Sequence, residues 1–75
     1  MPSQEFTLRD EYVALCDLLK LTGIADSGGQ AKLMVANNEV TVDGQPETRK
    51  TAKIRARQTV ECLGQQVRVV AAPVD

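Results

Sequence analysis

The sequence predicts a small α+β domain in which two short helices pack on one side of a twisted, mostly antiparallel sheet of four or five strands. Apolar residues recur at helical spacing in two segments of the first half, whereas alternating segments typical of strands dominate the second half. Glycines, an Asp-Gly pair and a proline fall between these segments, where turns are expected. A chain of 75 residues has the length of one domain, so residues 1–75 are taken as a single domain with a core at about residues 5–71. Residues 1–4 are expected to form a loose tail.

A strand and a helix are expected first. Phe6 and Leu8 alternate with polar neighbours, which predicts an edge strand over residues 5–9. Asp10 is the expected N-cap of a first helix over residues 11–21. The spacing of the apolar residues predicts one buried face on this helix, formed by Tyr12, Leu15, Leu18 and Leu19.

The next stretch carries clear signals for the end of one helix and the start of another. Gly23 ends the first helix, because glycine adopts the left-handed conformation without a Cβ clash. Ser27 is the expected N-cap of a second helix over residues 28–36, and Gln30 completes a capping-box pattern. The inner face of the second helix is expected to carry Ala31, Met34 and Val35.

A hairpin is expected directly after the second helix. Asn38 can end that helix in a left-handed conformation, and residues 40–42 alternate as a short strand. Asp43 and Gly44 form a strong two-residue turn signal. Pro46 limits the returning strand to a short or edge piece.

The remaining chain is expected to form short strands. Residues 51–58 are basic, with Ile54 as their one strong apolar anchor, and residues 59–63 alternate weakly. Gly64-Gln65 is the expected turn before a last strand over residues 66–71. One face of this last strand is expected to carry Val67 and Val69.

The composition argues against several classes of function. Histidine is absent, which removes the commonest general base and metal ligand, and Ser27 has no evident base partner, so an enzyme is not expected. Cys16 and Cys62 lack metal-ligand spacing and are expected to be buried reduced thiols, with no metal and no cofactor. Phe6 and Tyr12 are the only aromatic residues, so an aromatic platform for base stacking is not expected. No apolar run is long enough to span a membrane and no signal peptide is evident, which predicts a cytoplasmic protein.

Charge is distributed unevenly along the chain. The net charge is −1, but residues 1–47 carry three basic and eight acidic side chains, a net of −5, whereas residues 48–75 carry six basic and two acidic, a net of +4. Five of the nine basic residues fall within residues 49–57 with no acid among them. Such a cluster suits phosphate binding, although it could equally keep a sheet edge soluble.

The start of the second helix is a second candidate for phosphate binding. Its first turn offers the backbone NH groups of Ser27, Gly28 and Gly29, and Lys32 follows one turn later. The two glycines have two explanations, which are close packing against the first helix or close approach of a ligand. The basic side chains that could join this site are Lys20, Arg49, Lys50 and Lys53.

The segments LCDLLKLTGIADSGGQAK and NEVTVDG resemble the RNA-binding domain named after ribosomal small-subunit protein four, the S-four domain or alpha-L motif. SGGQAK and ETRKTAKI are similar to the small stand-alone bacterial members of this family. The resemblance covers residues 6–71. It implies a non-catalytic RNA-binding module that recognises structured RNA, such as ribosomal RNA, mainly by shape and phosphate. We expect a monomer whose RNA-binding residues are Lys20, Ser27, Gly28, Gly29, Gln30, Lys32, Arg49, Lys50, Lys53 and Arg55.

The sequence departs from the family pattern at several positions. Many members carry arginines on the second helix where this chain has Gly28 and Gln30. Asn38 stands where glycine is usual, and Arg57 stands where a turn glycine is common, so Arg57 is expected either to strain that turn or to extend the basic patch. The missing arginines and the net charge of −1 leave an alternative open, which is a protein-interaction adaptor that keeps the fold without an RNA role. A salt titration of RNA binding distinguishes the two.

Overall fold

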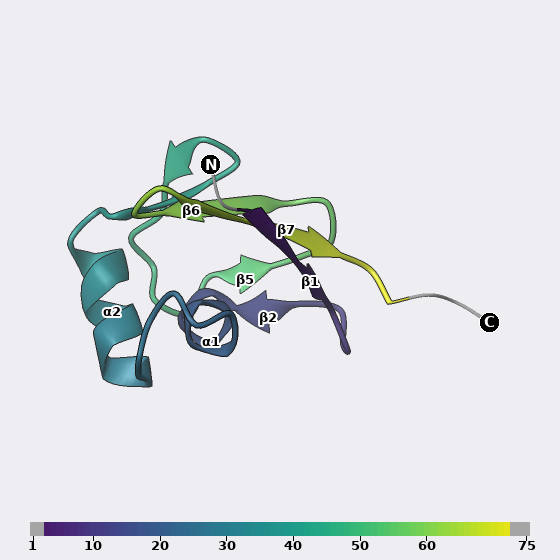
Figure 1. The fold of residues 1–75 in the computed structure, drawn as a ribbon, viewed down its shortest axis with the longest axis horizontal. Coiled ribbons are helices and arrows are strands. Elements are labelled where there is room, and N and C mark those ends of the chain that lie inside the picture. The colour runs from purple at the N-terminus through teal and green to yellow at the C-terminus, as the bar shows by residue number, and fades with distance from the viewer. Residues whose placement is uncertain (1–2, 73–75) are drawn as a thin grey trace.

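The computed structural model describes residues 3–72 and has the predicted α+β architecture. Its helices are α1 (Leu15–Leu21) and α2 (Gly28–Ala36). Its strands are β1 (Ser3–Thr7), β2 (Val13–Ala14), β3 (Val40–Val42), β4 (Gln45–Pro46), β5 (Lys53–Ile54), β6 (Thr59–Cys62) and β7 (Gln65–Val70). A five-stranded sheet has the order β1-β7-β6-β3-β4, and β2 and β5 form a separate two-stranded sheet. Both helices and the β2-β5 pair lie on the same side of the five-stranded sheet (Figure 1).

The core lies between the helices and the covered face of the sheet. The predicted inner faces of both helices are confirmed for Leu15, Leu18 and Leu19 and for Ala31, Met34 and Val35. The sheet contributes side chains from alternate positions, which are Val40, Val60, Cys62, Val67 and Val69. Ile54 is 1% exposed and anchors the basic segment as predicted. The buried residues of the described part form one contiguous cluster, as expected of a single small domain.

The start of α1 differs from the prediction. The helix begins at Leu15 instead of residue 11, its N-cap is Ala14, and no side chain caps it, so Asp10 does not have the predicted role. Val13 and Ala14 pair instead with β5 in an antiparallel register. The first NH groups of the helix donate to backbone carbonyls of the loop between β4 and β5, a partnership that local sequence cannot indicate.

The first strand lies two residues closer to the N-terminus than predicted. It spans Ser3–Thr7, so the predicted tail at residues 1–4 is wrong for Ser3 and Gln4, while residues 1 and 2 lie outside the described residues. The strand is at the edge of the sheet, as expected, but runs parallel to β7, with Ser3 opposite Gln66. Its position is set by β7, because an exposed edge strand with few apolar residues has a weakly specified register.

The turns that follow α2 are confirmed. Asn38 has φ 61°, as predicted for a left-handed helix end. Asp43 and Gly44 have φ 53° and 82°, and two successive positive φ values are characteristic of a tight hairpin turn. The Asp43 carboxylate Oδ1 also accepts a hydrogen bond from the Thr59 backbone NH at 2.9 Å, which ties this turn to β6.

The hairpin between β6 and β7 turns one residue earlier than predicted. Its central residues are Leu63 and Gly64, with φ 52° and 79°, so Gln65 already belongs to the last strand. A leucine in the left-handed region is unusual, because its Cβ clashes with the following carbonyl oxygen. Arg57 has φ 74°, so the expectation that it occupies a position suited to glycine is confirmed.

Replacing Leu63 by asparagine is expected to raise the free energy of unfolding by about 0.5–1 kcal/mol, because Asn-Gly is the preferred pair for such a turn. Leu63 is 63% exposed, so little packing is lost. The matched control is Leu33→Asn on α2, where the side chain is 64% exposed and the change should cost about 0.5 kcal/mol in helix propensity. Urea unfolding of both variants measures these changes. A lower free energy of unfolding in Leu63→Asn, as in Leu33→Asn, would contradict the prediction.

Candidate nucleic-acid interface

A shallow open groove lies beside α2 and the loop between β4 and β5. Its volume is about 890 Å³, and its lining is Lys32, Thr48, Arg49, Lys50, Thr51, Ala52, Lys53 and Arg55. Five of these eight residues are lysine or arginine and none is acidic. We call this surface the basic groove. It brings together five of the ten residues that the sequence and the family resemblance predicted to bind RNA, although those five come from α2, the loop before β5, β5 itself and the residue after it.

The loop between β4 and β5, which carries Arg49 and Lys50, is tied to the first helix. The Lys50 carbonyl accepts a hydrogen bond from the Cys16 NH at 3.1 Å, and the Ala52 carbonyl accepts one from the Leu15 NH at 2.9 Å. The Ala52 NH in turn donates to the Arg49 carbonyl at 3.2 Å, which closes a turn within the loop. The loop therefore caps α1, and α1 fixes the backbone from which the basic side chains project.

The other groove cations are exposed next to buried residues. Ile54 is buried, so its neighbours Lys53 and Arg55 are exposed. Lys32 is exposed next to the buried Ala31 on α2. Cationic side chains on an anchored backbone lose less conformational entropy on binding than those on a mobile tail.

One groove cation also forms an ion pair. The Arg49 Nε donates to the Glu47 carboxylate at 2.8 Å, which is the only salt bridge among residues 3–72. The Arg49 side chain is 80% exposed and that of Glu47 is 20% exposed, and a surface ion pair contributes about 0–1 kcal/mol. A phosphate could therefore replace the carboxylate at small cost.

The other five predicted site residues lie outside the lining of the basic groove. They are Lys20 near the end of α1 and Ser27, Gly28, Gly29 and Gln30 at the start of α2. Ser27 caps α2 as predicted, because its Oγ accepts a hydrogen bond from the Gln30 NH at 3.1 Å. The Gln30 side chain accepts from the Asp26 NH at 2.6 Å, one residue before the N-cap. Both side chains therefore already stabilise the helix start.

The two glycines of α2 are not required by packing. A Cβ added at Gly28 would meet nothing within 4 Å, and one added at Gly29 would meet only the Ser27 hydroxyl at 3.9 Å. The explanation by close packing against α1 is therefore wrong. The explanation by approach of a ligand stays a prediction.

Substitutions at Ser27 can separate its capping role from a role in binding. Ser27→Ala is expected to lower the free energy of unfolding by about 1 kcal/mol, because one orphan NH loses its acceptor. Ser27→Asp should keep the cap and the stability, yet weaken RNA binding several-fold, because its carboxylate repels phosphate at this helix end. Thermal unfolding and RNA titration of the two variants check both parts. Equal RNA affinity of wild type and Ser27→Asp would remove the start of α2 from the binding surface.

Tyr12 also differs from its predicted position. It does not belong to the buried face of α1 and is 41% exposed. Its ring lies 5.0 Å from the Lys53 ammonium and 5.8 Å from the Arg55 guanidinium. The signal that could have placed it is the β-branched Val13, which with Tyr12 and Ala14 alternates as in a strand.

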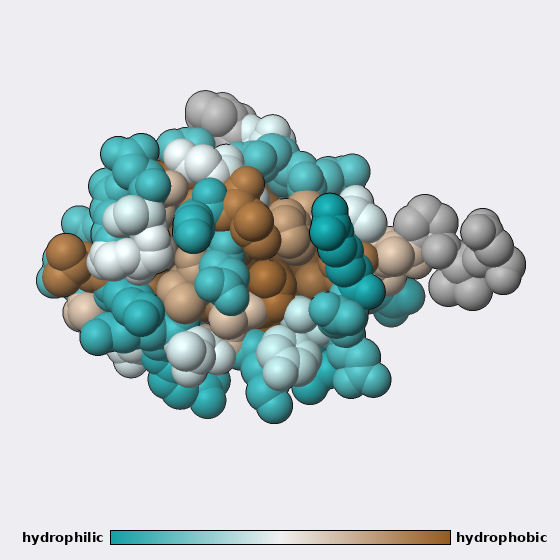
Figure 2. Space-filling model, turned by 90° about the horizontal axis from the view of Figure 1, so that it is seen from below, coloured by the Kyte–Doolittle hydropathy of each residue, from teal (hydrophilic) through white to brown (hydrophobic). Residues whose placement is uncertain are grey.

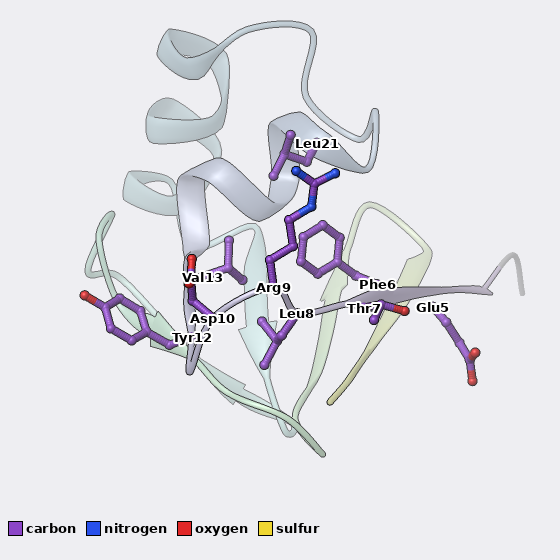
Figure 3. Close-up of a pocket in the computed structure, with 9 residues that line it drawn as sticks. All are labelled: Glu5, Phe6, Thr7, Leu8, Arg9, Asp10, Tyr12, Val13 and Leu21. Carbon is purple, nitrogen blue, oxygen red and sulfur yellow. The ribbon is translucent and has the colours of Figure 1, made fainter. Parts of the chain in front are cut away.

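A smaller cavity of about 390 Å³ lies between β1, the segment at residues 8–13 and Leu21, the last residue of α1 (Figure 3). Phe6, Leu8, Val13 and Leu21 contribute apolar atoms, and Arg9 extends towards Leu21. Apolar side chains also gather at the centre of the face seen in Figure 2, surrounded by hydrophilic ones. These apolar side chains could make hydrophobic contact with a partner.

The two cysteines lie in the interior of the domain. Cys16 and Cys62 are buried, as predicted, and neither is in a disulfide. Burial raises the pKa of the Cys62 thiol, and the Glu39 carboxylate raises it further, so this thiol is a poor nucleophile. Within residues 3–72 no cluster of three or more potential metal ligands occurs, and none of the helices there is long and apolar enough to cross a membrane.

Known proteins resemble this chain over most of its length. Residues 6–70 match the family of S4 domains. The chain belongs to the S4 domain family. Over 60 residues it is 57% identical to a protein of Escherichia coli (strain K12) named "Putative RNA-binding protein YbcJ", which corresponds to 80% of this chain and 86% of that protein. It is also 35% identical over 54 residues to the "Probable ribosome maturation protein RlbA" of Bacillus subtilis (strain 168), covering 72% and 76% of the two chains.

Solved structures extend the comparison. The solution structure of YbcJ from E. coli, described as revealing an alfaL motif involved in RNA-binding, matches with a TM-score of 0.71 and 53% identity, over 89% of this chain and 86% of that one. The 30S ribosomal protein S4e of Thermoplasma acidophilum matches with a TM-score of 0.59 and 27% identity, over 77% of this chain but 31% of that one. The alpha-L architecture expected from the sequence is therefore confirmed.

Proposed function

We propose that this S4 domain is a non-catalytic RNA-binding module that recognises structured RNA through its phosphates. The observation that carries the proposal is the basic groove, whose lining has five cations and no acidic residue, on a chain whose net charge is −1. A chance distribution on such a chain would mix both signs. Lysine and arginine contacts to phosphate dominate nucleic-acid affinity, because they release condensed counterions.

The proposed mechanism rests on shape and charge. Arg49, Lys50, Lys53 and Arg55 would follow one phosphate backbone along the anchored loop and β5, while Lys32 would approach it from α2. The helix start at Ser27–Gly29 and Lys20 would contact a more distant phosphate, if the RNA extends along both helices. Structured RNA presents phosphates at fixed positions, which suits cations held on a fixed backbone.

The class of RNA is suggested by the relatives. One relative is named a probable ribosome maturation protein, and a structural neighbour is a ribosomal protein. We therefore propose ribosomal RNA or a ribosome-assembly particle as the target, in the cytoplasm, with the protein acting as a monomer. Binding to ribosomal RNA fragments compared with an unrelated structured RNA tests this choice, and equal affinity for both would contradict it.

The salt dependence of RNA binding tests the proposal itself. With about four or five phosphate contacts, affinity should fall roughly 10²- to 10³-fold between 50 and 200 mM salt. Lys32→Ala should lower the logarithmic slope by about one, and Arg49→Ala/Lys50→Ala by about two. Fluorescence anisotropy with labelled RNA measures both quantities.

The alternative function, a protein-interaction adaptor, predicts a different result in these experiments. The cavity at Phe6, Leu8 and Leu21 could contribute apolar contact to a protein partner. An adaptor would show weak RNA binding that none of the groove substitutions changes. Unchanged affinity in both groove variants would therefore replace the RNA proposal with the adaptor.

A further inference from the structure

Tyr12 continues the lining of the basic groove. Val13 pairs with Ile54 in the β2–β5 ladder, so the antiparallel register places Tyr12 next to Arg55. Lys53 and Arg55 both line the groove, and both place their charges within 6 Å of the Tyr12 ring centre, at 5.0 and 5.8 Å. The aromatic ring therefore stands at the point where the line of cations ends.

The ring is exposed although aromatic residues are usually buried. Tyr12 is 41% exposed, and Figure 3 shows its side chain directed away from Phe6 and Leu21. It is not part of the hydrophobic core cluster, so the core does not account for an aromatic residue at this position. Lys53 and Arg55 lie over this ring, and an exposed aromatic ring can stack on a nucleic-acid base while neighbouring cations hold the phosphate of that nucleotide.

The surface beyond Tyr12 has the opposite charge. A second open concavity of about 910 Å³ is lined by Arg9, Asp10, Glu11, Tyr12, Val13, Ala14 and Asp17. Three carboxylates and one cation border it, so a phosphate backbone that followed the basic groove would meet repulsion past Tyr12. The RNA strand must therefore turn away or end at this point.

From these three observations we infer that Tyr12 stacks on one unpaired base of the bound RNA, with the phosphate of that nucleotide held by Lys53 and Arg55. The inference rests on the proposed function and names its substrate class, which is a helical RNA segment that carries an unpaired nucleotide. It differs from the expectation that no aromatic platform for base stacking is available, because one exposed ring suffices for one base.

Three RNA duplexes of the same sequence test the inference. One is fully paired, one carries a single bulged adenosine, and one carries an abasic residue at the bulge, which keeps the phosphate and removes the base. We expect the adenosine duplex to bind about tenfold more tightly than the other two, the scale of one base–aromatic stack. Tyr12 is the only tyrosine and the chain has no tryptophan, so tyrosine emission reports on this ring alone. Only the adenosine duplex should quench it.

Two variants test whether the aromatic ring of Tyr12 causes the preference for the adenosine duplex. Tyr12→Leu should lose the preference for the adenosine duplex over the paired and abasic ones, and Tyr12→Phe should keep it. Equal binding of the adenosine and abasic duplexes by the wild type, or a preference retained in Tyr12→Leu, would overturn the inference and leave the proposed function standing. Absence of salt-dependent binding to all three duplexes would overturn the proposed function and the inference with it.

Discussion

Replacing Lys50 and Lys53 by glutamate is expected to weaken RNA binding by more than about 100-fold at moderate salt, because two phosphate contacts become two repulsions. Both side chains line the basic groove, and both are exposed. The Lys50 carbonyl that caps α1 is a backbone group and is unaffected by the substitution. Anisotropy titration with a structured RNA measures the loss, and circular dichroism checks that the variant is folded.

The matched control carries the same change in charge elsewhere. Arg57→Glu/Arg68→Glu also takes the net charge from −1 to −5, since each substitution subtracts two. Arg57 and Arg68 are exposed and lie outside the lining of the groove, and Arg68 alternates with Val67 and Val69, so it lies on the uncovered face of the sheet. We expect this variant to retain affinity within a few-fold. An equal loss in both variants would mean that overall charge, and not the groove, determines binding.

Replacing Leu18 by alanine is expected to lower the free energy of unfolding by about 3 kcal/mol, within the range for deleting a buried leucine side chain. Leu18 is 0% exposed at the centre of α1, which packs against α2 and β2. A domain of this length has little stability to lose, and the melting temperature should fall by roughly 12–24 °C. Because α1 anchors the loop of the basic groove, RNA binding should be lost together with the fold.

A control for this prediction lies on the same helix. Leu21 is 65% exposed, so Leu21→Ala removes the same atoms from a site that is already in water. The stability of this variant should change by no more than about 0.5 kcal/mol. Thermal unfolding of both variants followed by circular dichroism gives the comparison. Similar losses at the two positions would show that Leu18 does not have the core role assigned to it.

Elements whose signals are local were predicted well. The bounds of α2, its Ser27 cap and the turn at Asp43-Gly44 agree with the structure, because each depends on hydrogen bonds or φ values within a few residues. The first helix did not follow its local signals. Its start depends on the carbonyls of Lys50 and Ala52, which are distant in the sequence.

The candidate site was also predicted only in part from the sequence. The cations of residues 49–55 could be read from the sequence as a cluster, and Lys32 as a possible neighbour, and the structure places all five around one groove. It does not bring Lys20 or residues 27–30 into that lining. Whether those residues bind RNA stays a prediction that the Ser27 variants can test.

The sequence by itself determined the fold class, the core faces of both helices, the hairpin turn and the uneven charge. These follow from periodicity and turn chemistry, which are properties of short segments. Only the tertiary structure decided where α1 begins, how β1 lies parallel to β7, and that Tyr12 stands beside the basic groove. Each of these depends on a pairing between residues far apart in the chain, and such pairings form where they best satisfy backbone hydrogen bonds and bury apolar surface across the whole domain.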